Sequence, residues 1–356
     1  MPYRIWNKLK DNFERLRVPE LDWIQIEVSS YCDASCIYCP HTVYRKIWQD
    51  HHMPLPAFRR LLSALSGINL VFLQGWGEPF LNPDFFEMVR LAKGAGCMVG
   101  TTTNGMSLDD DKIKQIVESG MDIMAFSLAG VDEGNDSIRR GTRFKTIMNA
   151  IETIDREKAR MGASKPSINI AYMLLRSGIK DLPKIPSVFS GSRISQVVIS
   201  TLDFIPDKEL AAEALLPADE AEFEHLSAIL DQVVADAKSL NLDVYYNLYN
   251  PSKRRQACTE NVQNSLFISS DGTVSPCVFT NLPIIESLLP GNNLFSAYRR
   301  LGFGNVNEYT LSSIWSQKAY KLFRNAFNSE NPPDVCLKCP KLYIAQSIQN
   351  EKEIQI

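Results

Sequence analysis

Three cysteines stand close together in the run Cys32-Asp33-Ala34-Ser35-Cys36-Ile37-Tyr38-Cys39-Pro40. They directly follow residues 24–28, a short apolar run that predicts a buried strand. Iron–sulfur clusters are usually held by four cysteine thiolates on closely spaced loops. This run supplies only three, so a cubane [4Fe–4S] cluster bound here would leave one iron atom open for a ligand that is not protein.

A second group of cysteines lies near the other end of the chain and comprises Cys258, Cys277, Cys336 and Cys339. Eight cysteines in all are unusual for a cytosolic chain unless they bind metal or do chemistry. The eight cysteines thus divide into a group of three, a group of four and a single residue, Cys97. This division fits two metal sites and a spare thiol better than four disulfides. Zinc is the alternative at both sites, although His41 is the only nearby fourth ligand for the first.

The composition is that of an ordinary globular protein. The chain has 356 residues, of which 45% are hydrophobic and 22% charged, and its formal net charge is -3. This balance gives no electrostatic reason to expect nucleic acid or a membrane surface as a partner. No apolar run approaches the roughly 20 residues that span a bilayer. The chain start lacks the apolar core of a signal peptide, so we expect a cytoplasmic location.

Strand and helix signals alternate from residue 22 onward. Strands are predicted at residues 24–28, 69–74, 97–101, 123–127, 167–174 and 196–201. Helices are predicted between them at residues 56–65, 84–93, 108–119, 144–158 and 179–188. This order predicts an α/β fold, a partial (β/α)6 TIM barrel whose active site lies at the carboxyl ends of parallel strands.

The pattern changes after residue 205. Residues 211–240 predict two helices around Leu216-Pro217, residues 241–248 predict a strand, and Asp271-Gly272 predicts a β-hairpin. Residues 281–303 predict a lid. The expected domains are an N-terminal helical extension at 1–21, the barrel at 22–205, a helical linking region at 206–252, a small cysteine-rich α+β domain at 253–345 and a tail at 346–356.

Polar turns follow three of the predicted strands: Gly75-Trp76-Gly77-Glu78-Pro79, Thr101-Thr102-Thr103-Asn104-Gly105 and Phe126-Ser127-Leu128-Ala129-Gly130. Glycine lets the backbone approach a ligand closely. Arg139, further along, could hold a carboxylate through two parallel hydrogen bonds. Because the strand ends meet at one edge of the sheet, these residues predict a cup for a ligand with an amine, a carboxylate and a ribose.

The sequence resembles the radical S-adenosylmethionine (radical SAM) enzymes over roughly residues 22–205. The resemblance rests on the CxxxCxxC run with Tyr38 before its third cysteine, and on the order of the three turns. It implies that Cys32, Cys36 and Cys39 hold a [4Fe–4S] cluster whose open iron is chelated by SAM. One electron, from a flavodoxin or ferredoxin-type donor, would cleave SAM to methionine and a 5′-deoxyadenosyl radical that abstracts a substrate hydrogen.

The resemblance also implies which residues bind SAM. Gly77 and Glu78 would contact its amino group, whereas Ser127 and Arg139 are candidates for the ribose and the carboxylate. The full set is Tyr38, Gly75, Gly77, Glu78, Asn104, Ser127 and Arg139. The aspartate that the family usually has at position 129 is Ala129 here, so position 129 is assigned no role.

The second cysteine group resembles the SPASM and twitch extensions of radical SAM enzymes. Cys258, Cys277, Cys336 and Cys339 would surround one auxiliary [4Fe–4S] cluster completely, the twitch-like arrangement. Two clusters are therefore expected. In sulfatase-maturing relatives an acidic base follows the cysteine after the hairpin. That position is Val278 here, which argues against their reaction.

The leading interpretation is a radical SAM enzyme, oxidoreductase-like, whose auxiliary cluster supports dehydrogenation of a small molecule or bond formation in it. Asp203, after the sixth strand, is a candidate to face the substrate. Modification of a peptide or protein is the alternative, disfavoured because only 21 residues precede the barrel. A non-catalytic iron–sulfur redox protein is the alternative of another class, and the polar turns speak against it.

Overall fold

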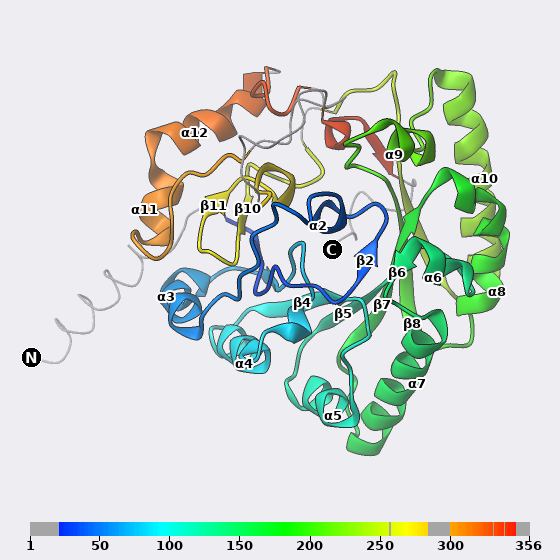
Figure 1. The fold of residues 1–356 in the computed structure, drawn as a ribbon, viewed down its shortest axis with the longest axis horizontal. Helices are drawn as coiled ribbons and strands as arrows, with labels where there is room; N and C mark the ends of the chain where they lie inside the picture. Colours follow the sequence, from blue (N-terminus) through cyan, green and yellow to red (C-terminus); the bar gives the residue numbers. More distant parts are fainter. Residues whose placement is uncertain (1–20, 256–257, 284–299, 330, 338, 347–356) are drawn as a thin grey trace, which may run out of the picture.

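The computed structural model describes residues 21–255, 258–283, 300–329, 331–337 and 339–346 (Figure 1). The expected N-terminal extension and C-terminal tail lie outside the described residues apart from residues 21 and 346, as does most of the expected lid. Within the described residues, no helix is both long and apolar enough to cross a membrane.

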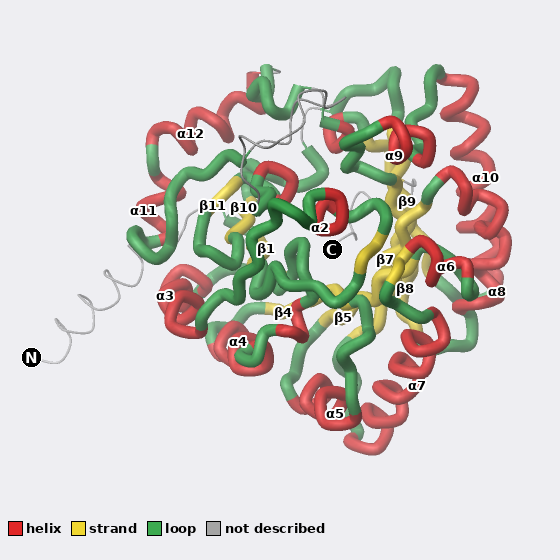
Figure 2. The backbone as a smooth tube through the Cα atoms, in the orientation of Figure 1, coloured by secondary structure: helices red, strands yellow, loops and turns green. Residues whose placement is uncertain are grey.

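The six strands predicted for the barrel are all present and lie side by side. They are β1 (Trp23–Ile26), β3 (Leu70–Phe72), β4 (Met98–Thr103), β5 (Ile123–Leu128), β7 (Ser167–Leu174) and β8 (Ile194–Thr201). Each pairs in parallel with the next. The expected parallel α/β sheet of a partial barrel is therefore confirmed (Figure 2).

The same sheet continues beyond these six strands at both ends. Its full order is β11-β10-β1-β3-β4-β5-β7-β8-β9-β12. At one end, β9 (Asp243–Tyr249) pairs in parallel with β8, and β12 (Ile344–Gln346) pairs antiparallel with β9. At the other end, β10 (Ser265–Ile268) pairs in parallel with β1, and β11 (Val274–Ser275) pairs antiparallel with β10. Segments from the second half of the chain thus flank the barrel on both sides.

Four helices of the barrel occur where the 3.6-residue period predicts them, and in Figure 1 they form part of the outer rim around the sheet. They are α3 (Leu55–Leu65), α4 (Phe85–Gly94), α5 (Asp110–Glu118) and α7 (Phe144–Met161). The two helices expected around Pro217 are α9 (Lys208–Glu213) and α10 (Glu220–Ser239). Asp207 and Asp219 cap their first turns through side-chain oxygens, as aspartate does at helix starts.

The helix predicted at residues 179–188 is α-helical only in its last part. The chain there forms a 3-10 helix (η2, Arg176–Lys184) followed by the short α8 (Ile185–Phe189). Pro183 and Pro186 lack the backbone N–H group that a regular α-helix needs, so the α-helical ladder is interrupted.

The other described elements are short: α2 (Pro40–Val43), β2 (Ser35–Cys36), α6 (Gly134–Ile138), β6 (Arg139–Arg140), α11 (Leu311–Ser316), α12 (Lys318–Asn325) and the 3-10 helices η1 (Pro79–Leu81), η3 (Val278–Thr280), η5 (Ala326–Ser329) and η6 (Pro340–Leu342).

Side chains alternate between the two faces of the sheet. On β7, Ile168 belongs to the main apolar core, whereas Asn169 and Ala171 line the interior cavity. Each fully buried aliphatic side chain contributes about 1.5–3 kcal/mol relative to exposure. The outer face therefore holds the fold together, and the inner face is left for small and polar residues.

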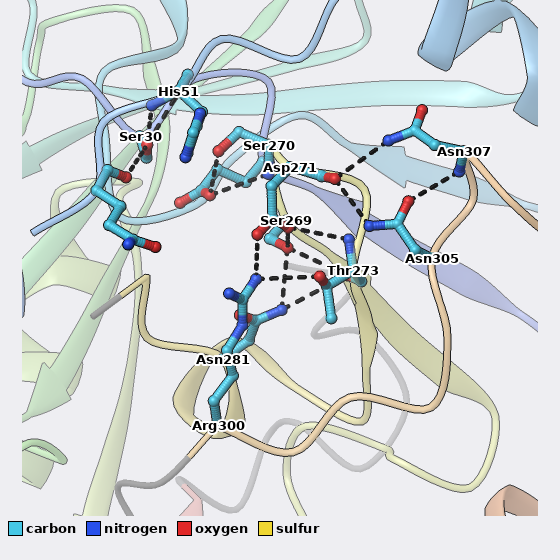
Figure 3. Close-up of polar contacts among 12 residues, drawn as sticks. Ser30, His51, Ser269, Ser270, Asp271, Thr273, Asn281, Arg300, Asn305 and Asn307 are labelled. Carbon is cyan, nitrogen blue, oxygen red and sulfur yellow. Dashed lines mark hydrogen bonds and ion pairs between the residues drawn. The ribbon is translucent and has the colours of Figure 1, made fainter. Parts of the chain in front are cut away.

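The predicted hairpin between β10 and β11 is confirmed, and its turn is held by Asp271 (Figure 3). The Asp271 carboxylate accepts hydrogen bonds from Ser269 (2.6 Å) and from the guanidinium of Arg300. Burial would raise the pKa of Asp271, but these bonds and the Arg300 charge outweigh it and lower the pKa to about 2. Gly272 has φ +88°, a conformation that favours glycine.

Candidate functional site

The three cysteines of the first group lie together at the carboxyl ends of the strands. Cys32 lies in the loop after β1 and Cys36 in the short strand β2, and the amide of Cys39 donates to the carbonyl of Cys36 over 3.1 Å. All three line one cavity of about 450 Å³, which the turns after β3, β4 and β5 also line. The structure thus brings together the thiols and the turns that the sequence predicted as one site.

Cys36 is buried and Cys32 and Cys39 are half-buried, and desolvation raises the pKa of Cys32 and of Cys39 to about 12. Thiolates at such positions need a compensating positive charge, and a metal centre supplies one while deprotonating the thiols that ligate it. The donor set of three converging thiols therefore fits a thiolate-bound iron–sulfur cluster.

The first site does not fit zinc with His41 as its fourth ligand. The His41 ring is buried and contacts Arg45 (3.0 Å from Nη1 to Nε2) and Asp50 (3.4 Å from Oδ1 to Nε2). Among the described residues, no three His, Cys, Asp or Glu side chains gather tightly enough to hold one metal ion. A cubane cluster spreads its thiolates over separate iron atoms, so its ligands stand further apart than those of a zinc ion.

The Gly75–Pro79 turn lies close to the loop that carries the cysteines. A Cβ atom on Gly77 would lie 2.3 Å from the carbonyl oxygen of Ser29, so only glycine fits. Glu78 is buried and accepts hydrogen bonds from Thr103 Oγ1 (2.8 Å) and the Asn104 amide (2.7 Å). Burial raises the pKa of Glu78 to about 7. The carboxylate thus joins the β3 turn to the β4 turn.

Asn104 connects these turns to the cysteine loop. Its Nδ2 donates to Asp33 Oδ1 over 2.6 Å and lies 3.9 Å from Cys32 Sγ. Ser127, on the inner face of β5, lines the same cavity. All the predicted SAM-binding residues line it: Tyr38, Gly75, Gly77, Glu78, Asn104, Ser127 and Arg139.

Arg139 is placed beside the cysteines by strand pairing. In the β2–β6 pair Cys36 is opposite Arg139, which is buried. Its guanidinium donates to the Tyr38 hydroxyl, whereas its Nε has no hydrogen-bond partner among the described residues. A buried guanidinium with an unpaired N–H group is suited to an anionic ligand.

The four cysteines of the second group line a second, smaller pocket. It is closed on its other sides by apolar residues that include Val262, Phe323 and Leu342. Burial raises the pKa of Cys277 to about 11 and that of Cys336 to about 12. The chemistry of this donor set also fits a thiolate-bound cluster, here with four protein ligands.

The second site contacts the first through the Gly75–Pro79 turn. Trp76 donates from its indole Nε1 to the carbonyl of Val278 over 3.2 Å, and its ring packs on Phe279 with centroids 5.5 Å apart. Glu27, fully buried, accepts from the Trp76 amide (2.8 Å) and from Ser270 Oγ (2.9 Å). Neither Glu27 nor the Trp76 indole was predicted to have a role, because no local pattern reveals a contact across some 200–240 residues.

A charged cluster also lies where the cavity meets the second site. The Lys341 ammonium contacts Asp203 (2.9 Å) and Glu260 (3.1 Å). Asp203 lines the cavity, as its position after the sixth strand predicted. Lys341 and Glu260 were missed, although each stands two residues after a cysteine of the second group, Cys339 and Cys258, which was a usable signal.

Two family models match the chain. The radical SAM superfamily model matches residues 26–161, and the SPASM model, described as an iron–sulfur cluster-binding domain, matches residues 258–340. The family resemblance inferred from the motifs is therefore confirmed. Together these domains imply [4Fe–4S] clusters.

Two curated relatives match most of the chain. A tungsten-containing aldehyde ferredoxin oxidoreductase cofactor-modifying protein of Pyrococcus furiosus is 23% identical over 85% of this chain and 83% of its own. A PqqA peptide cyclase of Gluconobacter oxydans is 22% identical over 88% of this chain and 81% of its own.

Among solved structures, Streptococcus suis SuiB bound to S-adenosylmethionine superposes with a TM-score of 0.64. It is 15% identical, and the match covers 92% of this chain and 72% of that chain. At this identity the likeness shows a shared fold.

Proposed function

Because this chain is a radical SAM protein with a C-terminal SPASM domain, we propose that it is an enzyme that cleaves SAM reductively and oxidises a small molecule. One observation carries the proposal: a single cavity is lined by Cys32, Cys36, Cys39 and the polar turns of three strands. An iron–sulfur electron carrier needs the thiols but has no use for the turns.

In this proposal Cys32, Cys36 and Cys39 would hold the first cluster, and the cup residues would hold SAM beside it. When bound, this pair supplies a 5′-deoxyadenosyl radical that abstracts a hydrogen atom from the substrate. Gly77 lets the turn pack directly against the backbone of residues 29–31, which lead into the cysteine loop. The unpaired N–H group of Arg139 would bind the SAM carboxylate, and Ser127, which lines the same cavity, would bind the ribose.

The remaining cup residues support the structure of the site. Glu78 and Asn104 fix the turns around the cysteine loop through their hydrogen bonds, and Gly75 gives Glu27 the space it occupies. Cys258, Cys277, Cys336 and Cys339 would hold an auxiliary cluster, which would supply electron transfer. A flavodoxin or ferredoxin-type protein is the proposed electron donor.

Anaerobic reduction tests this function. The reconstituted full-length protein is mixed with SAM and dithionite, and 5′-deoxyadenosine is measured. The wild type is expected to form it and to contain about eight iron atoms. Replacing Cys32, Cys36 and Cys39 by alanine should abolish 5′-deoxyadenosine and remove about half of the iron. A wild type that forms no more 5′-deoxyadenosine than this variant refutes the enzyme proposal in favour of a non-catalytic redox protein.

Peptide modification is the second candidate, because one relative is named a PqqA peptide cyclase. A small-molecule substrate is preferred because another relative is named a cofactor-modifying protein. Val278 also provides no acidic group at the position of the base in sulfatase-maturing enzymes.

A further inference from the structure

The end of the cavity nearest the second site contains polar side chains that the SAM cup does not use. They come from separate segments and comprise Asp203 after β8, Asn247 on β9, Thr259 and Glu260 after Cys258, and Lys341 after Cys339; we refer to these five residues as the distal pole. The distal pole lines the same cavity as the first cysteine group, so a ligand there faces the proposed SAM site.

Lys341 organises the distal pole. Its ammonium contacts Asp203 (2.9 Å) and Glu260 (3.1 Å), and the three side chains are only 10–18% exposed. An ammonium carries three N–H groups, and the two carboxylates account for two of them. The ammonium also lies 5.3 Å from the centre of the Phe279 ring. One N–H group of Lys341 thus remains for a ligand in the cavity.

Two neighbouring polar atoms lack any hydrogen-bond partner among the described residues: Asn247 Oδ1 and Thr259 Oγ1, both buried. Asn247 is paired in register with Ser200, three residues before Asp203, and the Thr259 amide donates to the Lys341 carbonyl over 3.4 Å. Leaving such buried atoms without a hydrogen bond is unfavourable, and a ligand bound in the cavity would supply the missing partner.

The missing partner must both donate and accept hydrogen bonds. The carboxamide oxygen of Asn247 needs a donor, the spare N–H of Lys341 needs an acceptor, and the Thr259 hydroxyl serves either. A hydroxyl group donates once and accepts twice, which matches this set. Other strands of the sheet add neutral polar groups to the lining of the same cavity, among them Gln25, Thr102 and Ser200.

We propose that the distal pole is the substrate-recognition site of this enzyme and that it takes a small molecule carrying several hydroxyl groups. This inference rests on the proposed function, because it places the substrate opposite the SAM cup. Thr259, Asn247 and Lys341 are the specificity-determining residues, and Asp203 and Glu260 position the Lys341 ammonium.

The test uses myo-inositol as a hydroxylated probe and N-acetylglycinamide as a peptide-like probe. Binding to the full-length, anaerobically reconstituted protein with SAM present is measured by saturation-transfer NMR titration. Wild-type protein, Thr259→Val, Asn247→Leu and Thr42→Val are compared. Thr42→Val is the matched control, because the Thr42 hydroxyl is also buried and unpartnered among the described residues but does not line the cavity.

We expect myo-inositol to bind and N-acetylglycinamide to bind more weakly. Thr259→Val and Asn247→Leu should each weaken myo-inositol binding about tenfold, whereas Thr42→Val leaves it unchanged. None of the three should lower the unfolding temperature, because each removes a polar atom that has no partner in the free protein. Loss of binding without loss of stability distinguishes recognition from a structural role.

The inference is overturned if myo-inositol does not bind, if N-acetylglycinamide binds more tightly, or if the two distal-pole variants bind like Thr42→Val. Formation of 5′-deoxyadenosine is measured on the same samples. SAM cleavage without myo-inositol binding removes this inference alone, whereas absence of SAM cleavage removes the proposed function.

Discussion

Glu27 is a single carboxylate that holds together two parts of the chain separated by 243 residues. It accepts hydrogen bonds from the Trp76 amide (2.8 Å), the Ser270 amide (3.1 Å) and Ser270 Oγ (2.9 Å). Burial nevertheless raises the pKa of Glu27 from 4.5 to about 7, because the hydrogen bonds lower it by less than desolvation raises it. The folded state therefore holds this proton more tightly than the unfolded state.

This shift predicts a pH-dependent contribution to stability. Because the folded state binds this proton more tightly, Glu27 contributes its full stabilisation to the free energy of unfolding below pH 4.5. This stabilisation is lost as the pH rises through about 7. The loss corresponds to about 3 kcal/mol. Glu27→Gln does not titrate, so the difference in unfolding free energy between wild type and variant should change by about this amount between pH 4.5 and pH 8.

Guanidinium unfolding at a series of pH values measures this difference. The control is Glu133→Gln, which replaces an exposed carboxylate paired with Lys145 and should leave the step in place. Parallel curves for wild type and Glu27→Gln would contradict the assignment of the step to Glu27.

At the scale of elements, the Gly75–Pro79 turn connects the strand ends to the cysteine loop. A Cβ on Gly77 would lie 2.3 Å from the Ser29 oxygen and 2.5 Å from the Tyr31 oxygen, both backbone atoms that cannot rotate away. Gly77→Ala must displace the turn or this loop, and we expect it to lower the free energy of unfolding by about 1–3 kcal/mol and to weaken SAM binding.

Gly94→Ala is the matched control for this substitution. Gly94 ends α4, and a Cβ atom added there would have nothing within 4 Å, so alanine should be neutral or stabilise the helix by up to about 1 kcal/mol. Chemical unfolding and equilibrium dialysis against labelled SAM measure the two effects. Equal behaviour of the two variants would show that Gly77 is not under steric constraint.

Local chemistry explains which elements could be predicted from the sequence. The six strands, α3 to α5, α7 and the two helices around Pro217 follow from hydrophobic period, aspartate caps and turn residues, all of which are local. The three turns could be placed together because parallel strands end at one edge of the sheet. The prediction of one regular α-helix over residues 179–188 was only partly right, because two prolines interrupt the helical hydrogen bonds there.

Long-range pairing explains what could not be predicted. The pairing of β10 with β1, and of β12 with β9, joins segments far apart in the chain, and no local pattern specifies such partners. The Lys341 cluster depends on the same pairing, because β12 begins three residues after Lys341 and is aligned beside β9. The members of both cysteine groups could be identified from the sequence, but the position of one group relative to the other could not.

At the scale of the whole molecule, β1 is an interior strand only because β10 covers one of its edges. It pairs with β3 on one side and with β10 on the other. A fragment of residues 1–252 lacks β10, so the edge of β1 loses its partner, and Glu27 loses both hydrogen bonds from Ser270. An exposed apolar strand edge favours association between chains.

We therefore expect the fragment 1–252 to aggregate, or to unfold at a lower temperature than the full chain, even though it contains the whole first cysteine group. Light scattering and circular dichroism melting measure the two outcomes. Co-expression with residues 253–356 should restore a soluble complex, because the second segment supplies β10 and Ser270. A monomeric fragment that melts like the full chain would mean that the sheet is divided into two independent units, and that the contacts of Glu27 and Trp76 with the second half contribute little to stability.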